Sequence, residues 1–130
     1  MAVTLTTAAR NAACDAIVDL LDGGAGDAAG DITFATSGAA LNLCTCAMSN
    51  PAFGAASTGV ATASAISQGT VSGSGNPSTI AVALFRNRAN TEIFRCAVGT
   101  SGSDINLSSV SVSDSDTIDI TSLTFTVPAS

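Results

Sequence analysis

The side chains that could do chemistry in this chain are ten carboxylates, four cysteines and many serines and threonines. The sequence has no histidine and no lysine, so the usual general base and a common metal ligand near neutral pH are both missing. No Gly-x-Ser-x-Gly motif precedes a predicted helix, and no base is available to activate a hydroxyl. These residues indicate a protein that is not an enzyme.

Two groups of aspartates are closely spaced in the sequence. One is Asp114, Asp116 and Asp119, and the other is Asp22, Asp27 and Asp31. The first group resembles half of a calcium-binding loop. It lacks the glycine at the sixth position and the glutamate at the twelfth. We expect solvated turns at both groups, and the alternative for the first is a cation that bridges subunits. The scarcity of aromatic residues also removes the usual platform on which sugars stack, so no glycosidase is predicted. We expect no metal, no cofactor and no small-molecule substrate.

The four cysteines are Cys14, Cys44, Cys46 and Cys96. Cys44 and Cys46 lie two residues apart on a predicted strand and point to the same side, which is poor geometry for a disulfide between them. A Cys-x-Cys pair can begin a metal site, but a second pair and any histidine are missing. We expect buried, reduced thiols that act as small apolar side chains. A disulfide from Cys96 to one of the strand cysteines stays open.

Glycine-rich loops and arginines are the remaining candidates for a binding role. Gly73-Ser-Gly75 and Gly99-Thr-Ser-Gly102 have neither a following helix nor a lysine, so phosphate binding is not predicted. Arg86 and Arg88 border a predicted hairpin turn, and Arg95 follows on the return strand. We expect these arginines to keep the hairpin end soluble. The alternative is a basic spot that contacts an acidic surface of a partner.

The composition limits the classes of partner. Charged residues make up 11% of the 130 residues, against about 25% in ordinary soluble proteins, and the net charge is −6. Clustered cations for nucleic acid or an anionic membrane are absent, and no apolar run approaches the roughly 20 residues that span a bilayer. No signal peptide is predicted, so we expect synthesis and folding in a cytoplasm. Weak surface charge and an alanine-rich core favour burial of outer surface in an oligomer.

One amphipathic helix is predicted over residues 8–22, after an arm over residues 1–7, and Gly23-Gly24 ends it. Thr6 or Thr7 is suited to cap the helix. The apolar positions at helical spacing are Ala9, Ala13, Ile17, Leu20 and Leu21. The polar positions Asn11, Asp15, Asp19 and Asp22 are expected on the opposite side. We expect the helix to pack on a sheet in the same domain.

After a loop over residues 23–30, the sequence alternates with a period near two. The predicted strands are Asp31–Thr36, Leu41–Met48, Gly59–Ser67, Ile80–Arg86, Thr91–Val98, Ile105–Leu107, Val110–Val112 and Thr117–Val127. Residues 69–78 are interpreted as a loop or a weak edge strand, residues 87–90 as a hairpin turn, and Thr121–Ser122 as a β-bulge. Ile32 and Phe34 are expected on one face of their strand, and Leu41 is expected to share a face with Leu43.

The sequence thus has about seven or eight short predicted strands. They predict an antiparallel β-sandwich or small barrel over residues 31–127, with one N-terminal α-helix. We expect a single domain over residues 1–130.

Several blocks of the sequence resemble a family of small virion proteins of tailed bacteriophages and prophages. The blocks are the opening Met1-Ala-Val-Thr-Leu-Thr-Thr-Ala-Ala-Arg through Asp22-Gly-Gly, Ser49-Asn-Pro-Ala-Phe-Gly-Ala, Val98-Gly-Thr-Ser-Gly-Ser-Asp-Ile-Asn-Leu and Ile120-Thr-Ser-Leu-Thr-Phe-Thr-Val-Pro. They keep their order and are spread from end to end of the chain. The arginine-rich hairpin and the cysteines at 44 and 46 depart from the family pattern. The resemblance implies a structural role in the particle and no active site.

The resemblance implies a capsid decoration (cement) protein that binds the outer surface of the major capsid protein lattice, as a homotrimer, and stabilises the head. The expected location is therefore the virion, after synthesis in the cytoplasm of the bacterial host. A neck, tail or fibre-associated virion protein with a binding role is the alternative, and an enzyme is the third class considered. The arm Met1–Thr7 is the one suggested contact with a neighbour, and no other interface residue is assigned.

Overall fold

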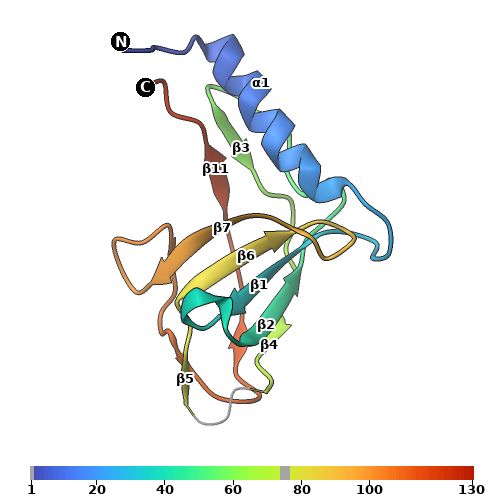
Figure 1. The fold of residues 1–130 in the computed structure, drawn as a ribbon, viewed down its shortest axis with the longest axis vertical. Coiled ribbons are helices and arrows are strands. Elements are labelled where there is room, and N and C mark those ends of the chain that lie inside the picture. Colours follow the sequence, from blue (N-terminus) through green and yellow to red (C-terminus); the bar gives the residue numbers. More distant parts are fainter. Residues whose placement is uncertain (1, 74–76) are drawn as a thin grey trace.

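The computed structural model describes residues 2–73 and 77–130 and shows a mainly β chain with one N-terminal α-helix (Figure 1). The helical elements are α1 (Thr7–Val18), η1 (Asp19–Asp22) and η2 (Ser37–Ala39). The strands are β1 (Asp31–Ala35), β2 (Asn42–Ala47), β3 (Val60–Thr62), β4 (Gly69–Thr70), β5 (Ser78–Thr79), β6 (Val82–Arg86), β7 (Glu92–Gly99), β8 (Ile105–Asn106), β9 (Ser111–Val112), β10 (Thr117–Ile118) and β11 (Thr124–Thr126).

The predicted helix is confirmed over α1 and η1, but its buried side differs from the prediction. Thr6 caps it, since its hydroxyl accepts a hydrogen bond from the amide of Ala9 at 3.2 Å. Cys14, Val18 and Leu21 form the buried stripe, whereas Leu20 is 53% exposed. The prediction was therefore wrong for Leu20 and also for Ala9, which is exposed. The reason is that alanines on both sides of the helix leave its apolar phase poorly defined.

The polar side chains of this helical segment bind the chain itself. Asn11 Oδ1 accepts from the amide of Gly59 at 2.7 Å, Asp15 Oδ1 from Ala56 at 2.7 Å and Asp22 Oδ1 from Ala52 at 2.8 Å. These three side chains were expected to lie opposite the packed face, and that expectation was wrong. They satisfy backbone donors of residues 52–59 that belong to no long strand, and so fix that segment against the helix.

Replacing Asp15 by alanine should therefore loosen residues 52–59. The lost hydrogen bond to a charged acceptor is expected to cost about 1.5–3 kcal/mol of stability. Hydrogen exchange at the Ala56 amide should accelerate by more than the global destabilisation explains, and NMR measures this residue by residue. Asp19→Ala is the matched control, because Asp19 is exposed on the same helical segment. Equal exchange rates at Ala56 in the two variants would contradict this role.

The largest sheet has the strand order β2-β1-β6-β7-β8 and curls into half a barrel. The pairs β2–β1, β1–β6 and β6–β7 are antiparallel, and β8 joins β7 in parallel. The predicted hairpin is confirmed as β6–β7. Its turn is held by Asn87 Oδ1, which accepts from the amides of Ala89 and Thr91 at 2.9 and 3.0 Å.

The direction in which each side chain of β1 and β2 points decides whether it is buried. Ile32 and Phe34 lie on the core face of β1, as predicted, and are fully buried. The pairing with β2 shifts between Phe34 and Ala35, which leaves Leu43 as an extra residue opposite them. Leu43 is consequently buried next to Cys44, while Leu41 is 42% exposed. The expectation that Leu41 and Leu43 share a face was wrong because the bulge breaks the alternation.

The last third of the chain differs most from the prediction. The single strand expected over Thr117–Val127 is two short strands in different sheets: β10 pairs with β4, and β11 pairs with β3. The slip expected at Thr121–Ser122 is a break over residues 119–123. Residues 69–78 were expected to form a loop or a weak edge strand, and both are found. β4 and β5 are short strands, and the described residues between them belong to no strand. Residues 74–76 of that stretch, which include most of Gly73-Ser-Gly75, lie outside the described residues.

These elements make the predicted β-rich fold with one N-terminal helix, and that prediction is confirmed. The curled sheet lies in the middle of Figure 1, and α1 lies beside the β3–β11 ribbon at one end. One continuous cluster of buried side chains joins α1 to the sheets, including Val18, Ile32, Phe85 and Ile118. The N-terminal arm is also tied to the body, since the amide of Leu5 donates to the carbonyl of Ala129 at 2.7 Å.

Candidate binding cleft

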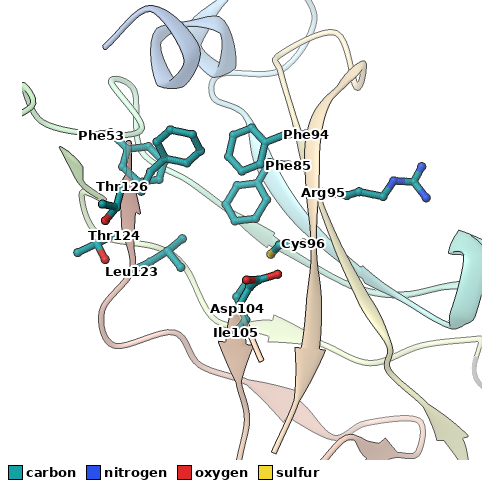
Figure 2. Close-up of a pocket in the computed structure, with 11 residues that line it drawn as sticks. Phe53, Phe85, Phe94, Arg95, Cys96, Asp104, Ile105, Leu123, Thr124 and Thr126 are labelled. Carbon is teal, nitrogen blue, oxygen red and sulfur yellow. The ribbon is translucent and has the colours of Figure 1, made fainter. Parts of the chain in front are cut away.

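A cleft of about 460 Å³ lies between β7 and β11 (Figure 2). It is lined by Phe53, Phe85, Phe94, Arg95, Cys96, Asp104, Ile105, Leu123, Thr124, Phe125 and Thr126. Four of the five phenylalanines of the chain lie here. In a chain without tryptophan or tyrosine, this is where most of the aromatic surface is concentrated.

The aromatic rings form a connected group. Phe85 on β6 stacks on Phe94 of β7 with ring centroids 4.4 Å apart, and Phe94 meets Phe125 of β11 at 5.1 Å. Phe53 and Phe85 are buried, whereas Phe94 and Phe125 are only half-buried. The rings of Phe94 and Phe125 thus offer an apolar surface to whatever enters the cleft.

Polar groups stand at its rim. The Arg95 side chain points away from the rings (Figure 2) and forms a two-point contact with Glu92, with both N–O distances 2.6 Å. The hydrogen bonds from Arg95 lower the pKa of the Glu92 carboxyl below its ordinary value. Asp104 Oδ2 accepts from the amide of Ala97 at 3.1 Å. The described part of the cleft therefore presents aromatic rings, the Cys96 thiol and polar groups that are held by contacts within the chain.

Cys96 is the thiol of this cleft, and it should react slowly. Burial, reinforced by the negative charge of Asp104, raises the pKa of Cys96 from 9.0 to about 11. Because the thiolate is the reactive form, a pKa of about 11 in place of 9.0 lowers the thiolate fraction near pH 8 roughly a hundredfold. Labelling with a thiol-reactive chromophore should be slow in the folded protein and should accelerate as pH rises toward 11. Asp104→Asn should speed the labelling of Cys96, and an unchanged rate would contradict the influence of that carboxylate.

The four cysteines are free thiols, and Cys14, Cys44 and Cys46 are buried. This agrees with the expected small apolar role, and the disulfide that was left open for Cys96 is not formed. Cys44 and Cys46 do point to the same side: a Cβ on Gly69 would lie 2.5 Å from Cys44 Sγ and 2.9 Å from Cys46 Sγ. The neighbouring thiol and burial together raise the pKa of Cys46. A glycine at position 69 is what leaves room for both sulfurs.

Among the residues that the structure describes, no three His, Cys, Asp or Glu side chains come together as metal ligands would. Asp116 Oδ2 accepts from the amide of Ser113 at 2.9 Å and so stabilises a turn. The members of the other group are separated. Asp22 binds the Ala52 amide, Asp27 accepts from the Asn90 amide group at 3.0 Å, and Asp31 binds Arg86.

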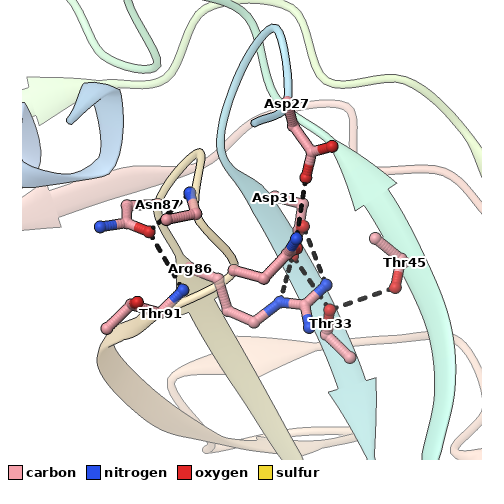
Figure 3. Close-up of polar contacts among 9 residues, drawn as sticks. Asp27, Asp31, Thr33, Thr45, Arg86, Asn87 and Thr91 are labelled. Atoms are coloured by element: carbon pink, nitrogen blue, oxygen red, sulfur yellow. Dashed lines mark hydrogen bonds and ion pairs between the residues drawn. The ribbon is translucent and has the colours of Figure 1, made fainter. Parts of the chain in front are cut away.

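Asp31 and Arg86 make the main buried ion pair of the described chain (Figure 3). Arg86 Nε and Nη2 donate to the two oxygens of Asp31 at 2.8 and 2.9 Å. The Thr33 hydroxyl donates to Asp31 Oδ1 at 3.0 Å and lies 3.1 Å from the Thr45 hydroxyl. The pair joins β1 to β6 on the sheet face opposite the rings, and Asp31 and Thr33 are buried there. Its role is therefore to hold these strands together.

The other arginines are also engaged within the chain. Arg88 Nε donates to the carbonyl of Asp27, and Arg10 Nε to that of Val127, both at 2.8 Å. Arg95 binds Glu92. Arg86, Arg88 and Arg95 therefore each serve a different contact within the chain. The glycine-bearing segment at residues 99–102 leads into β8, and no helix follows it.

Sequence reasoning did not predict the aromatic cleft. Its rings come from positions 53, 85, 94 and 125, and only the pairing of Phe85 with Phe94 across the hairpin could have been anticipated. Comparisons with protein-family models, with curated proteins and with solved structures find no match. Among the described residues, no helix has the length and apolar character needed to cross a bilayer. The fold and the cleft define a β-rich chain with an aromatic cleft.

Proposed function

We propose that this chain is a non-enzymatic structural protein of a tailed-bacteriophage virion, and specifically a capsid decoration protein. It would bind the outer surface of the major capsid protein lattice as a homotrimer and stabilise the head. The assignment to a phage particle rests on the resemblance of the sequence to small virion proteins. One structural observation supports the non-catalytic class: charged side chains such as Asp15, Asp31 and Arg86 bind other parts of the same chain. None of these three lines the cleft, whose charged lining residues are Arg95 and Asp104.

The proposed mechanism needs no chemistry. A decoration protein makes many weak contacts that repeat over a symmetric shell, and the sum of these contacts resists the pressure of the packaged DNA. A subunit suited to this role holds its own shape and offers apolar surface to a neighbour. The internal ion pair of Asp31 with Arg86 and the half-buried rings of Phe94 and Phe125 match these two requirements.

The location of the chain on the particle tests the proposal. Virions from the host that carries this gene are labelled with gold-conjugated antibody against the chain and viewed by electron microscopy. Antibody that was first absorbed with the purified protein serves as the control. Dense labelling over the head, with hundreds of copies per particle, is the expected result. Label confined to the neck or tail would overturn the decoration role in favour of a neck, tail or fibre-associated protein, and unlabelled virions would overturn both.

A further inference from the structure

Two cysteine sulfurs meet beneath a glycine in the core. Cys44 and Cys46 are alternate residues of β2 on the face that packs against the interior, and they are 4% and 0% exposed. Their side chains are joined by a hydrogen bond. A Cβ on Gly69 would stand 2.5 Å from Cys44 Sγ and 2.9 Å from Cys46 Sγ, so both sulfurs lie against the same point of β4. The two thiols are therefore a contiguous pair of soft ligands inside the fold.

The short strand β4 covers this sulfur pair and lies beside β2 in Figure 1. The amides of Ser67 and Ser72 donate to backbone carbonyls of β2 at 2.8 and 2.9 Å, one on each side of β4. Between these two bonds β4 pairs with β10, and Gly69 places no side chain on the sulfurs. The backbone of Gly69 instead forms a hydrogen bond with Cys46. Separating a strand of two residues breaks few hydrogen bonds, which gives a small ion a route to the pair.

We infer that Cys44 and Cys46 form a binding site for a soft, closed-shell metal ion, and specifically for Cu(I). Thiolates are the ligands that Cu(I) prefers, and this ion accepts two sulfurs in a line without a third partner. Binding releases both thiol protons to solvent, including the one that Cys46 donates to the carbonyl of Ile118 at 3.8 Å. Two sulfur–copper bonds replace the two sulfur–hydrogen bonds, and no electron is transferred. The hydrogen bond from the backbone of Gly69 offsets part of the negative charge that stays on the sulfurs.

The number of ligands separates Cu(I) from zinc. Structural zinc takes four ligands in a tetrahedron, and among the described residues no three His, Cys, Asp or Glu side chains gather in one place. The lack of a second cysteine pair and of histidine therefore argues against zinc, but it does not argue against an ion with two ligands. The two cysteines are also free thiols, and alternate residues of one strand are poorly placed for a disulfide with each other. Both sulfurs consequently stay available to a metal.

The test uses the intact, reduced chain and Cu(I) held by the coloured chelator bicinchoninate, in the absence of oxygen. The unchanged protein is expected to withdraw one Cu(I) per chain from the chelator, which is measured as a loss of colour. Cys44→Ala and Cys46→Ala should each weaken the binding more than about tenfold, because even changes outside the ligand set reach that size. Cys14→Ala is the matched control, since it removes another fully buried thiol, and it should bind Cu(I) like the unchanged protein. Cys96→Ala should also leave the binding unchanged.

Measurements on the unchanged protein keep the test valid if a cysteine variant unfolds. X-ray absorption at the copper edge should show two sulfur neighbours at about 2.3 Å, and NMR shifts should centre on the amides of Cys46 and Gly69. Cu(I) should also raise the midpoint of thermal unfolding, because it binds the folded chain. A lowered midpoint, or equal Cu(I) binding by Cys44→Ala and the unchanged protein, would overturn the inference. None of these results depends on virion labelling, so this inference and the proposed function fail separately.

Discussion

Replacing Arg86 by methionine is expected to lower the free energy of unfolding by about 3–5 kcal/mol. The variant leaves the Asp31 carboxylate, which is 7% exposed, with the Thr33 hydroxyl and without its cation. An uncompensated buried charge costs more than the pair contributes, because the carboxylate has lost its hydration and its partner together. Urea unfolding followed by circular dichroism measures the loss as a lower midpoint.

Two further variants separate this effect from a general loss of charge. Arg95→Met breaks the exposed pair with Glu92 and should leave the unfolding midpoint nearly unchanged, because water screens that pair. Asp31→Leu combined with Arg86→Met removes both charges and should recover most of the stability lost in Arg86→Met. If Arg86→Met and Arg95→Met shift the midpoint equally, the buried network of Asp31 does not hold β1 to β6.

Phe34→Ala should be about as damaging, with an expected loss of about 3–5 kcal/mol. Phe34 is fully buried at the centre of the curled sheet, where strands β2 and β6 flank it and leave little room for collapse. Thermal unfolding measures the effect. Phe34→Leu keeps most of the apolar contact and should lose clearly less. A similar loss in both variants would show that the ring shape, and not the cavity, decides the stability at this position.

The features that could be predicted from the sequence are those fixed by nearby residues. The helix follows from the Thr6 cap and the glycines after Asp22, and the β6–β7 hairpin follows from two alternating runs around Asn87. In each case the residues that determine the element lie within a few positions of it. Local propensity and turn chemistry are therefore sufficient.

The remaining features depend on contacts between distant parts of the chain. Asp31 pairs with Arg86 across 55 positions, and neither residue has a local feature that distinguishes it from a solvated charge. The aromatic cleft likewise needs β11 to lie opposite β7. Residues 117–127 alternate like one strand, yet β10 and β11 bind different partners, and alternation alone carries no information about where a strand changes sheets.

The contacts of the N-terminal helix set the order in which this protein can mature on the ribosome. Arg10 donates to the carbonyl of Val127, and the Cys14 thiol donates to that of Phe125. The helix is therefore made before the β11 segment on which it docks. Until Val127 has been added, apolar side chains that are covered in the finished fold stay exposed. They include Val18 and Leu21 of the helical segment and the rings of the cleft. The nascent chain consequently completes its core only after synthesis has passed β11, and chains that stop before β11 should aggregate or be degraded.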